Sequence, residues 1–299
     1  MTVNSYALEF VRSFLTQRRQ RVISSDGKPT DFVDVTSGVP QGSVIGPFLF
    51  AIVVNSFRPV NENTCVIAYA DDLTILCPES NNENEVTQIE ASNIYNWSLN
   101  HGLEINLAKT VVLPLSRRTI NAEPCIFVNH RILKVVHSTK ILGVVLDSNL
   151  KWNGHVSYLK SKCSQAMFGI RSLHRSGCSD DTMIDAFNAL VFSRLQFAWP
   201  VFCDISASQM KSVLSFEKTI NRFCRKKSKN SIKAKLDRSC LKLMQSIILD
   251  FDNHRLSKFF TRRQVSTYSL REQRSLLPVC WKTALSRNSF LKFYSKFSF

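Results

Sequence analysis

Two adjacent carboxylates, Asp71 and Asp72, are the side chains of this sequence best suited to hold a metal ion. They lie between two short runs of β-branched and apolar residues, 64–68 and 73–77, which are typical of strands buried on both faces. We therefore expect the pair at the tip of a β-hairpin, where the two charges repel each other and lose hydration. A hard divalent cation with oxygen ligands, such as Mg²⁺, would compensate this cost. The alternative is a solvent-facing turn, in which acidic residues are common.

A second segment, upstream of the carboxylates, can bring backbone and amide groups close to a ligand. Residues 37–47 read Ser-Gly-Val-Pro-Gln-Gly-Ser-Val-Ile-Gly-Pro, and Gly42 permits a close approach of the backbone. The amide of Gln41 both donates and accepts hydrogen bonds. An apolar run, 48–54, follows and predicts a helix. Taken alone, the segment favours a simpler interpretation, a turn that leads into a core helix with Gln41 in solvent.

Together, the two segments resemble the palm of a reverse transcriptase, and their amino-acid motifs are most similar to those of the non-LTR retrotransposon group. Other segments agree with this family in their order along the chain. Residues 101–110 resemble the palm segment that carries a lysine, here Lys109. Residues 141–147 resemble the strand called the primer grip, and Trp152 with the helix expected after it resembles the start of the thumb.

The resemblance implies a role for each matching residue. Asp71 and Asp72 would hold Mg²⁺ or Mn²⁺ in a two-metal site, with Asp71 the more important ligand. Lys109 would act near the diphosphate leaving group, although a surface lysine beside a strand is the alternative. Gln41 and Gly42 would position the incoming nucleotide. The remaining substrate-binding candidates are Tyr69, which would pack against a primer nucleotide, Leu142 and Gly143.

A third metal-binding aspartate of the family lies on a strand upstream of the loop, and we find no equivalent in this sequence. The upstream acids fall on a predicted helix, in a turn or directly before the loop, and they are Glu9, Asp26, Asp31 and Asp34. None is expected in a strand with the family's apolar and aromatic neighbours. We therefore expect the C-terminal part of a reverse transcriptase, without the fingers and the first palm aspartate, from a reading frame that is truncated, decayed or wrongly assigned at Met1.

The fold class expected from these features is α+β. An incomplete right-hand polymerase palm, an antiparallel sheet with helices, would occupy residues 1–148, and a basic helical thumb and C-terminal region would occupy 149–299. Helices are predicted near residues 4–18, 84–100, 153–173, 180–198, 207–227 and 236–249, with Gly102 ending the second. Strands are predicted near residues 110–115, 125–128, 132–136 and 141–146, with a turn at Asn129-His130.

Charge divides the chain sharply. Residues 1–150 carry 12 Lys and Arg against 14 Asp and Glu, whereas residues 151–299 carry 27 against 9. Such a basic half is typical of a surface that binds a polyanion. Its densest patch contains the nucleic-acid-binding candidates Arg222, Arg225, Lys226, Lys227 and Lys229, with Trp199, Phe216 and Phe223 near enough in sequence to stack on bases. The alternative is a solvated basic loop.

Composition argues against several other classes of protein. The longest clean apolar run, 48–54, is far shorter than the roughly 20 residues of a membrane span. The first residues lack the charged and apolar regions of a signal peptide. Nine scattered cysteines without a Cys-x-x-Cys pair argue against zinc knuckles and a disulfide scaffold. We therefore expect an intracellular protein, nuclear or cytoplasmic, that is not secreted and has no membrane partner.

By resemblance, the function is RNA-directed DNA polymerisation by a retrotransposon protein. Its partners would be an RNA template, a DNA primer and deoxynucleoside triphosphates, and its cofactor would be Mg²⁺ or Mn²⁺. Because the upstream aspartate is missing, a second hypothesis is a non-catalytic nucleic-acid-binding remnant of such a polymerase. A third hypothesis is a metal-dependent nuclease that uses Asp71 and Asp72, in which the loop around Gln41 has no role.

Overall fold

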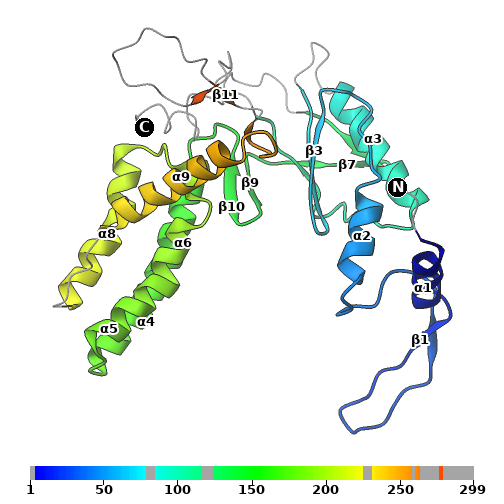
Figure 1. Ribbon diagram of the computed structural model, residues 1–299, viewed down its shortest axis with the longest axis horizontal. Coiled ribbons are helices and arrows are strands. Elements are labelled where there is room, and N and C mark those ends of the chain that lie inside the picture. Colours follow the sequence, from blue (N-terminus) through cyan, green and yellow to red (C-terminus); the bar gives the residue numbers. More distant parts are fainter. Residues whose placement is uncertain are drawn as a thin grey trace. The chain divides into compact units, whose positions relative to one another are not determined.

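The computed structural model describes residues 4–78, 85–115, 124–224, 231–257, 260–262 and 276–278 (Figure 1). Contacts group the chain into two compact units. The first comprises Met1–Val112 and Ala122–Val135, and the second comprises Leu113–Asn121 and Val136–Phe299. The domain boundary expected near residue 148 stays a prediction.

The first unit combines three helices with short strands in its described residues. In chain order its elements are α1 (Ser5–Leu15), β1 (Arg18–Gln20), β2 (Val33–Val35), α2 (Gly46–Val54), β3 (Cys65–Tyr69), β4 (Asp72–Leu76), α3 (Glu85–Asn100), β5 (Val111–Val112), β6 (Phe127–Val128), β7 (Arg131–Ile132) and β8 (Lys134–Val135). The pairs β1–β2, β3–β4 and β6–β7 are antiparallel, and β5–β8 is parallel. This mixture of helices and small sheets agrees with an α+β fold.

The chain enters the first unit through a helix and a hairpin. The Asn4 side chain caps α1 by accepting a hydrogen bond from the Tyr6 N–H at 2.9 Å. The predicted turn at Asp26-Gly27 joins β1 to β2 and is confirmed, since Gly27 has a φ of 79°. The Asp26 carboxylate accepts from the Lys28 N–H at 3.3 Å, an arrangement that favours this turn.

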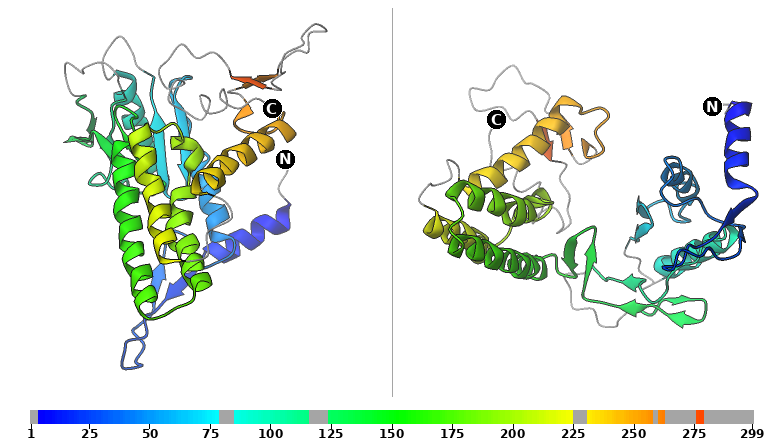
Figure 2. Two further views of the ribbon diagram at one scale, coloured as in Figure 1. Left: turned by 90° about the vertical axis from the view of Figure 1, so that its left-hand side faces the viewer. Right: turned by 90° about the horizontal axis from the view of Figure 1, so that it is seen from below.

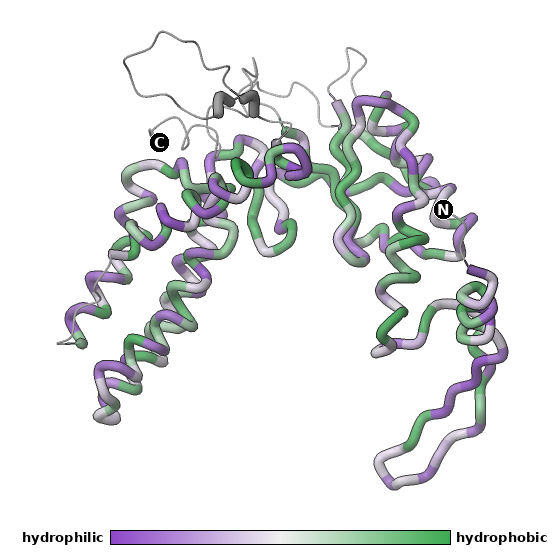
Figure 3. Tube along the Cα trace, viewed as in Figure 1, coloured by the Kyte–Doolittle hydropathy of each residue, from purple (hydrophilic) through white to green (hydrophobic). Residues whose placement is uncertain are grey.

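The hairpin expected around the two aspartates is confirmed, but its expected burial is wrong. Strands β3 and β4 pair so that Tyr69 lies opposite Asp72. The Ile67 and Tyr69 side chains are 46% and 65% exposed, because β3 and β4 pair only with each other among the described residues and no further strand or helix covers both faces. Figure 3 shows a hairpin with hydrophobic arms and a hydrophilic tip.

Helix α3 confirms the helix predicted near residues 84–100 and its end at Gly102. Gly102 has a φ of 64°, and its N–H donates to the Leu99 carbonyl at 3.1 Å. The next N–H, from Leu103, donates to the Ser98 carbonyl at 2.8 Å. These two bonds form a Schellman motif, in which glycine adopts the left-handed conformation without a steric penalty.

A buried carboxylate ties α3 to the segment that connects α2 and β3. Glu90 is 1% exposed, and its carboxylate accepts the backbone N–H groups of Val60 and Asn61 at 3.2 and 2.8 Å. Nearby, the indole Nε1 of Trp97 donates to the Ser56 hydroxyl at 3.1 Å. The helix therefore supports the chain just before the hairpin that carries the two aspartates.

The second unit is mostly helical in its described residues. Its elements are β9 (Ser138–Ile141), β10 (Val144–Asp147), α4 (Asn153–Arg175), α5 (Asp180–Phe187), the π-helix η1 (Asn188–Phe192), α6 (Ser193–Gln196), α7 (Trp199–Phe202), α8 (Ala207–Phe223), α9 (Ile232–Leu249), β11 (Phe260–Arg262) and β12 (Leu276–Pro278). These confirm the four helical segments predicted after Trp152, with α8 ending at Phe223 and α9 beginning earlier than expected. No helix among the described residues is both long and apolar enough to cross a membrane.

The strand predicted over residues 141–146 is wrong, because the chain reverses within it. Leu142 and Gly143 form a two-residue turn with φ values of 46° and 88°, and β9 pairs with β10 across it. Positive φ at both central residues suits the twist of a tight hairpin. A run of branched apolar residues conceals this turn, since Leu142 gives no turn signal.

The core of the second unit lies between its helices. Helix α4 packs beside α5, η1 and α8, as Figure 2 shows. Its buried residues Leu159, Cys163 and Met167 recur at intervals of four, which places them on one face. Burial raises the pKa of the Cys163 thiol to about 11, so this cysteine serves as a small apolar residue.

One histidine, His155, is enclosed in this core at 1% exposure. Its Nδ1 accepts the Val145 N–H at 3.3 Å, and its ring meets the Phe202 ring edge-on, with centroids 4.4 Å apart. Burial lowers the pKa of His155, so the neutral ring is the folded form near neutral pH.

We expect Glu90→Ala to lower the free energy of unfolding of the first unit by about 1 to 3 kcal/mol, because two partly buried N–H groups lose their charged acceptor. Glu90→Gln keeps one acceptor oxygen, so its free energy of unfolding should fall by about half as much. Hydrogen exchange of the α3 amides under increasing urea measures both losses. Glu62→Ala, an exposed carboxylate on the same connection, is the matched control; an equal loss in that variant would contradict the role of Glu90.

We expect acid to destabilise the second unit through His155. The folded pKa of His155 lies below the unfolded value of about 6.5. The stability that the neutral ring contributes is therefore complete above pH 6.5 and is lost as the pH falls through the folded pKa. The slope for one proton is at most about 1.4 kcal/mol per pH unit. His155→Asn keeps an acceptor for Val145, and thermal unfolding of this variant should lose that pH dependence. Parallel profiles for variant and wild type would contradict the assignment.

Candidate active site

One arginine holds the entry to the 37–47 loop. Arg18 donates from Nε to the Leu15 carbonyl at 3.1 Å. Its Nη2 donates to the Ser37 and Gly38 carbonyls at 3.0 and 2.7 Å. Because one planar guanidinium bridges the end of α1 and the loop, the loop begins from a fixed position.

Ser43 closes the loop and starts α2. Its Oγ donates to the Pro40 carbonyl at 2.7 Å and accepts the Gly46 N–H at 3.1 Å. A Cβ on Gly46 would lie 2.6 Å from that Oγ, so a larger residue there would displace the serine. Gly42 has a φ of 81° with nothing within 4 Å of an added Cβ, so its backbone conformation, and not space, favours glycine.

The hairpin tip places the two aspartates differently. Ala70 and Asp71 form the two-residue turn between β3 and β4, and Asp72 is the first residue of β4. Ala70 has a φ of 50°, an uncommon value for a residue with a Cβ. Both aspartates are exposed, which corrects the expectation that they lose hydration among apolar neighbours. The aspartates are exposed because β3 and β4 pair only with each other among the described residues.

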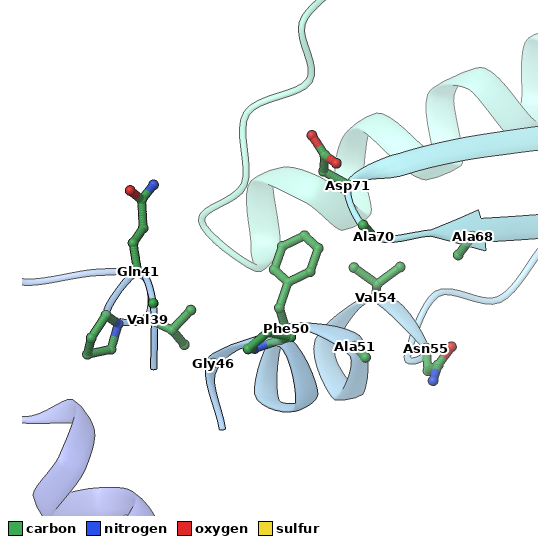
Figure 4. A pocket seen from close by; sticks show the side chains of 13 residues that line it. Val39, Gln41, Gly46, Phe50, Ala51, Val54, Asn55, Ala68, Ala70 and Asp71 are labelled. Atoms are coloured by element: carbon green, nitrogen blue, oxygen red, sulfur yellow. The ribbon is translucent and has the colours of Figure 1, made fainter. Parts of the chain in front are cut away.

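The structure brings the loop, α2 and the hairpin tip together around one open pocket of about 520 Å³. Figure 4 shows Gln41 on one side, Asp71 on the other, and Phe50 of α2 rising between them. The lining residues are Val39, Pro40, Gln41, Gly42, Gly46, Pro47, Phe50, Ala51, Val54, Asn55, Ala68, Ala70 and Asp71. The floor is apolar and the two opposed ends are polar, an arrangement that suits a ligand with one flat apolar part and charged groups.

Other predicted site residues lie outside this pocket lining. Lys109 is an exposed residue of a turn before β5, where its N–H donates to the Asn106 side chain at 3.2 Å. Tyr69 is 65% exposed at the end of β3. Leu142 and Gly143 belong to the second unit, where a Cβ on Gly143 would lie 3.0 Å from the Phe197 ring. Their roles stay predictions.

Most of the predicted basic patch falls outside the described residues. Arg225, Lys226, Lys227 and Lys229 lie there, and Arg222 is exposed in the last turn of α8. Trp199 and Phe216, expected to stack on bases, are instead buried at 1% and 7% exposure. Phe223 is half-buried and packs against the His174 ring with centroids 5.3 Å apart. The helical core requires these rings, so they are not available to a nucleic acid.

The donors at the hairpin tip suit a hard cation but supply only part of its coordination shell. Asp71 and Asp72 offer exposed carboxylate oxygens, which Mg²⁺ and Mn²⁺ prefer. The described residues contain no group of three His, Cys, Asp or Glu side chains placed to bind one metal ion. Asp34, which we expected directly before the loop, lies in the short strand β2, where its carboxylate pairs with Arg19 at 3.5 Å.

The sequence interpretation missed the residues that support the pocket. Arg18 and Glu90 make the contacts that hold the loop and the α2–β3 connection, and Phe50 forms the floor. The arginine directly after a helix gave a weak signal, because its carbonyl partners come from a distant segment. Glu90 gave none, since a carboxylate within a polar helix is usually solvated.

Comparison with known proteins gives matches that include these elements. Residues 1–146 match the family described as reverse transcriptase (RNA-dependent DNA polymerase). A putative 115 kDa protein in the type-1 retrotransposable element R1DM of Drosophila melanogaster is 28% identical over 199 residues, which are 64% of this chain and 19% of that protein. No solved structure matches the chain.

Two further relatives carry similar names. The RNA-directed DNA polymerase from the mobile element jockey of Drosophila melanogaster is 28% identical over 159 residues, 50% of this chain and 17% of the relative. A retrovirus-related Pol polyprotein from the type-1 retrotransposable element R1 2 of Nasonia vitripennis is 28% identical over 148 residues, 46% and 35% of the two chains. The chain spans less than a fifth of the first two relatives. Residues 1–146 therefore match the reverse transcriptase family, and the similar proteins are named as products of type-1 retrotransposable elements and of the mobile element jockey.

Proposed function

We propose that this chain is the palm and thumb part of an RNA-directed DNA polymerase that adds deoxynucleotides to a DNA primer on an RNA template. The observation that carries the proposal is the pocket between Gln41 and Asp71, because it joins the two segments that resemble the family. The jockey relative is named as an RNA-directed DNA polymerase, which supports the same activity. In this proposal the first unit is the palm, and the basic second unit holds the nucleic acid.

In this proposal, the residues of the pocket and of the hairpin tip have distinct tasks. Asp71 and Asp72 would hold Mg²⁺ or Mn²⁺, which activates the primer hydroxyl and neutralises the departing diphosphate when bound. The Phe50 ring offers an apolar surface for a base or sugar. Gln41 would hydrogen-bond the incoming nucleotide, and the bare backbone of Gly42 allows it to approach.

The lining of the pocket favours this proposal over a nuclease. A hydrolytic metal site requires room for water and one strand, whereas this pocket adds an amide and an aromatic floor opposite the carboxylate. Those groups match a nucleoside triphosphate, which carries a flat base and a charged tail. Binding of nucleic acid without incorporation is the outcome expected of a non-catalytic remnant.

We expect Asp71→Asn to lower metal-dependent incorporation of deoxynucleotides on the order of 100-fold or more, because the ligand that lines the pocket loses its charge. Asp72→Asn should lower it less, since Asp72 lies outside the lining. The measurement is primer extension on an RNA template with Mg²⁺ or Mn²⁺. Asp31→Asn, which removes an exposed carboxylate from another part of the chain, is the control. Wild-type chain that binds the hybrid but incorporates nothing would favour the remnant.

We expect Gln41→Ala to raise KM for the deoxynucleotide by roughly twofold to tenfold, the value of one neutral hydrogen bond, with a smaller change in kcat. Steady-state incorporation at varied nucleotide concentration separates the two parameters. Gln20→Ala makes the same substitution on β1, outside the pocket lining, and should change neither. An unchanged KM in Gln41→Ala would remove this residue from nucleotide binding.

A further inference from the structure

One tyrosine hydroxyl in the second unit accepts a hydrogen bond from a lysine, and two further cationic residues act on it electrostatically. Lys140 of β9 donates from Nζ to the Tyr158 hydroxyl of α4 at 3.0 Å, and its Nζ lies 4.7 Å from the ring centroid. The charges of Lys162 and Arg194 also act on this hydroxyl. We call these four residues the tyrosine–cation cluster.

The local fold places the members of the cluster on accessible surfaces. Exposure alternates along β9, so Lys140 stands on its solvent side. Lys162 follows Tyr158 by four residues on α4, which puts both on one helix face. Arg194 reaches α4 from α6 and donates from Nη1 to the Lys162 carbonyl at 2.8 Å. The π-helix η1 directly precedes α6, and π-helical turns within helices are frequent at functional sites.

The electrostatics of the cluster favour an anion. The pKa of Tyr158 is lowered, first by the hydrogen bond from Lys140 and then by the charges of Lys140, Lys162 and Arg194, while burial opposes the shift. Helix α4 carries four Lys and Arg and no Asp or Glu over its 23 residues. Like charges that act on one hydroxyl repel each other, so a bound anion would stabilise the arrangement. The Tyr158 hydroxyl accepts from Lys140 and keeps its own proton to donate to that anion.

An exposed aromatic residue, Phe197, directly follows α6, the helix that carries Arg194. Phe197 follows Arg194 by three residues and is 55% exposed. Its ring covers Gly143 at the β9–β10 turn, where Leu142 is 43% exposed. Cations next to an exposed ring are typical of surfaces that hold a nucleic-acid backbone and stack one of its bases.

We propose that Lys140, Tyr158, Lys162 and Arg194 form a binding site for the phosphodiester backbone of a nucleic-acid strand, with Phe197 available to stack on a neighbouring base. Arginine, lysine and tyrosine all donate hydrogen bonds to phosphate oxygens. The site lies outside the basic patch of residues 222–229. The inference deepens the proposed polymerase function by naming where the second unit grips its substrate, and it rests on that function only for the identity of the strand.

The test measures binding of a fluorescently labelled DNA–RNA hybrid to the full chain, without metal ions or nucleotides. The variant Lys140→Gln with Lys162→Gln should weaken binding by about tenfold. The slope of log K against log salt should become shallower by roughly 0.7 to 0.9 for each lysine that contacts a phosphate. Tyr158→Phe, which keeps the ring and removes the hydroxyl, should weaken binding by a smaller factor.

Lys160→Gln is the matched control, because Lys160 is exposed on α4 and is not among the groups that act on the Tyr158 hydroxyl. An unchanged affinity and salt slope in the double variant, or an equal loss in Lys160→Gln, would overturn the site. If the double variant fails to fold by circular dichroism, the single variant Lys162→Gln decides in the same way. If the wild-type chain incorporates no deoxynucleotide but the double variant binds the hybrid more weakly, the binding site stands and the polymerase proposal fails. If the wild-type chain is active but the double variant binds as tightly as wild type, only the binding site is overturned.

Discussion

The buried carboxylate of Glu90 is the contact on which the candidate site depends. It accepts two backbone N–H groups from Val60 and Asn61, which lie between α2 and β3. Since α2 and the β3–β4 tip are two walls of the pocket, this contact governs how they meet. Without it, two amide donors would need other partners in a connection that water only partly reaches. Helix α3 therefore supports the pocket while contributing no residue to its lining.

Local patterns predicted the helices and the aspartate hairpin, whereas contacts between distant segments were beyond them. Periodic apolar residues and Gly102 located α3 and its end, because those signals act within one turn of helix. The β9–β10 turn escaped prediction, since Leu142 in the left-handed conformation is held by its surroundings and not by its own preference. The pocket could be predicted only as two motifs. Their meeting depends on Arg18 and Glu90, whose partners lie far away in sequence.

The exposure of Asp71 and Asp72 changes how the site is understood. A desolvated pair would need a cation to fold at all, whereas an exposed pair is hydrated and can exchange water for a metal ion at low cost. In the proposed polymerase, the metal and the nucleotide phosphates would bind together, because Mg²⁺ usually binds through one or two carboxylates plus substrate phosphates. An incomplete set of carboxylates in the described residues is compatible with that mode of binding.

Three described hairpin tips begin with a left-handed residue other than glycine, and at two of them this residue is apolar. Ala70 precedes Asp71 with a φ of 50°, and Leu142 precedes Gly143 with a φ of 46°. A left-handed residue with a side chain costs about 1 to 2 kcal/mol, and asparagine or glycine would form either turn more easily. Such strain persists only where the surrounding structure fixes the conformation, and it is common at ligand-binding sites. At the first tip the tight turn holds Asp71 against the pocket, and at the second it seats Gly143 under Phe197. At both tips, a backbone conformation that lowers local stability therefore fixes the position of a particular residue, Asp71 at the first and Gly143 at the second.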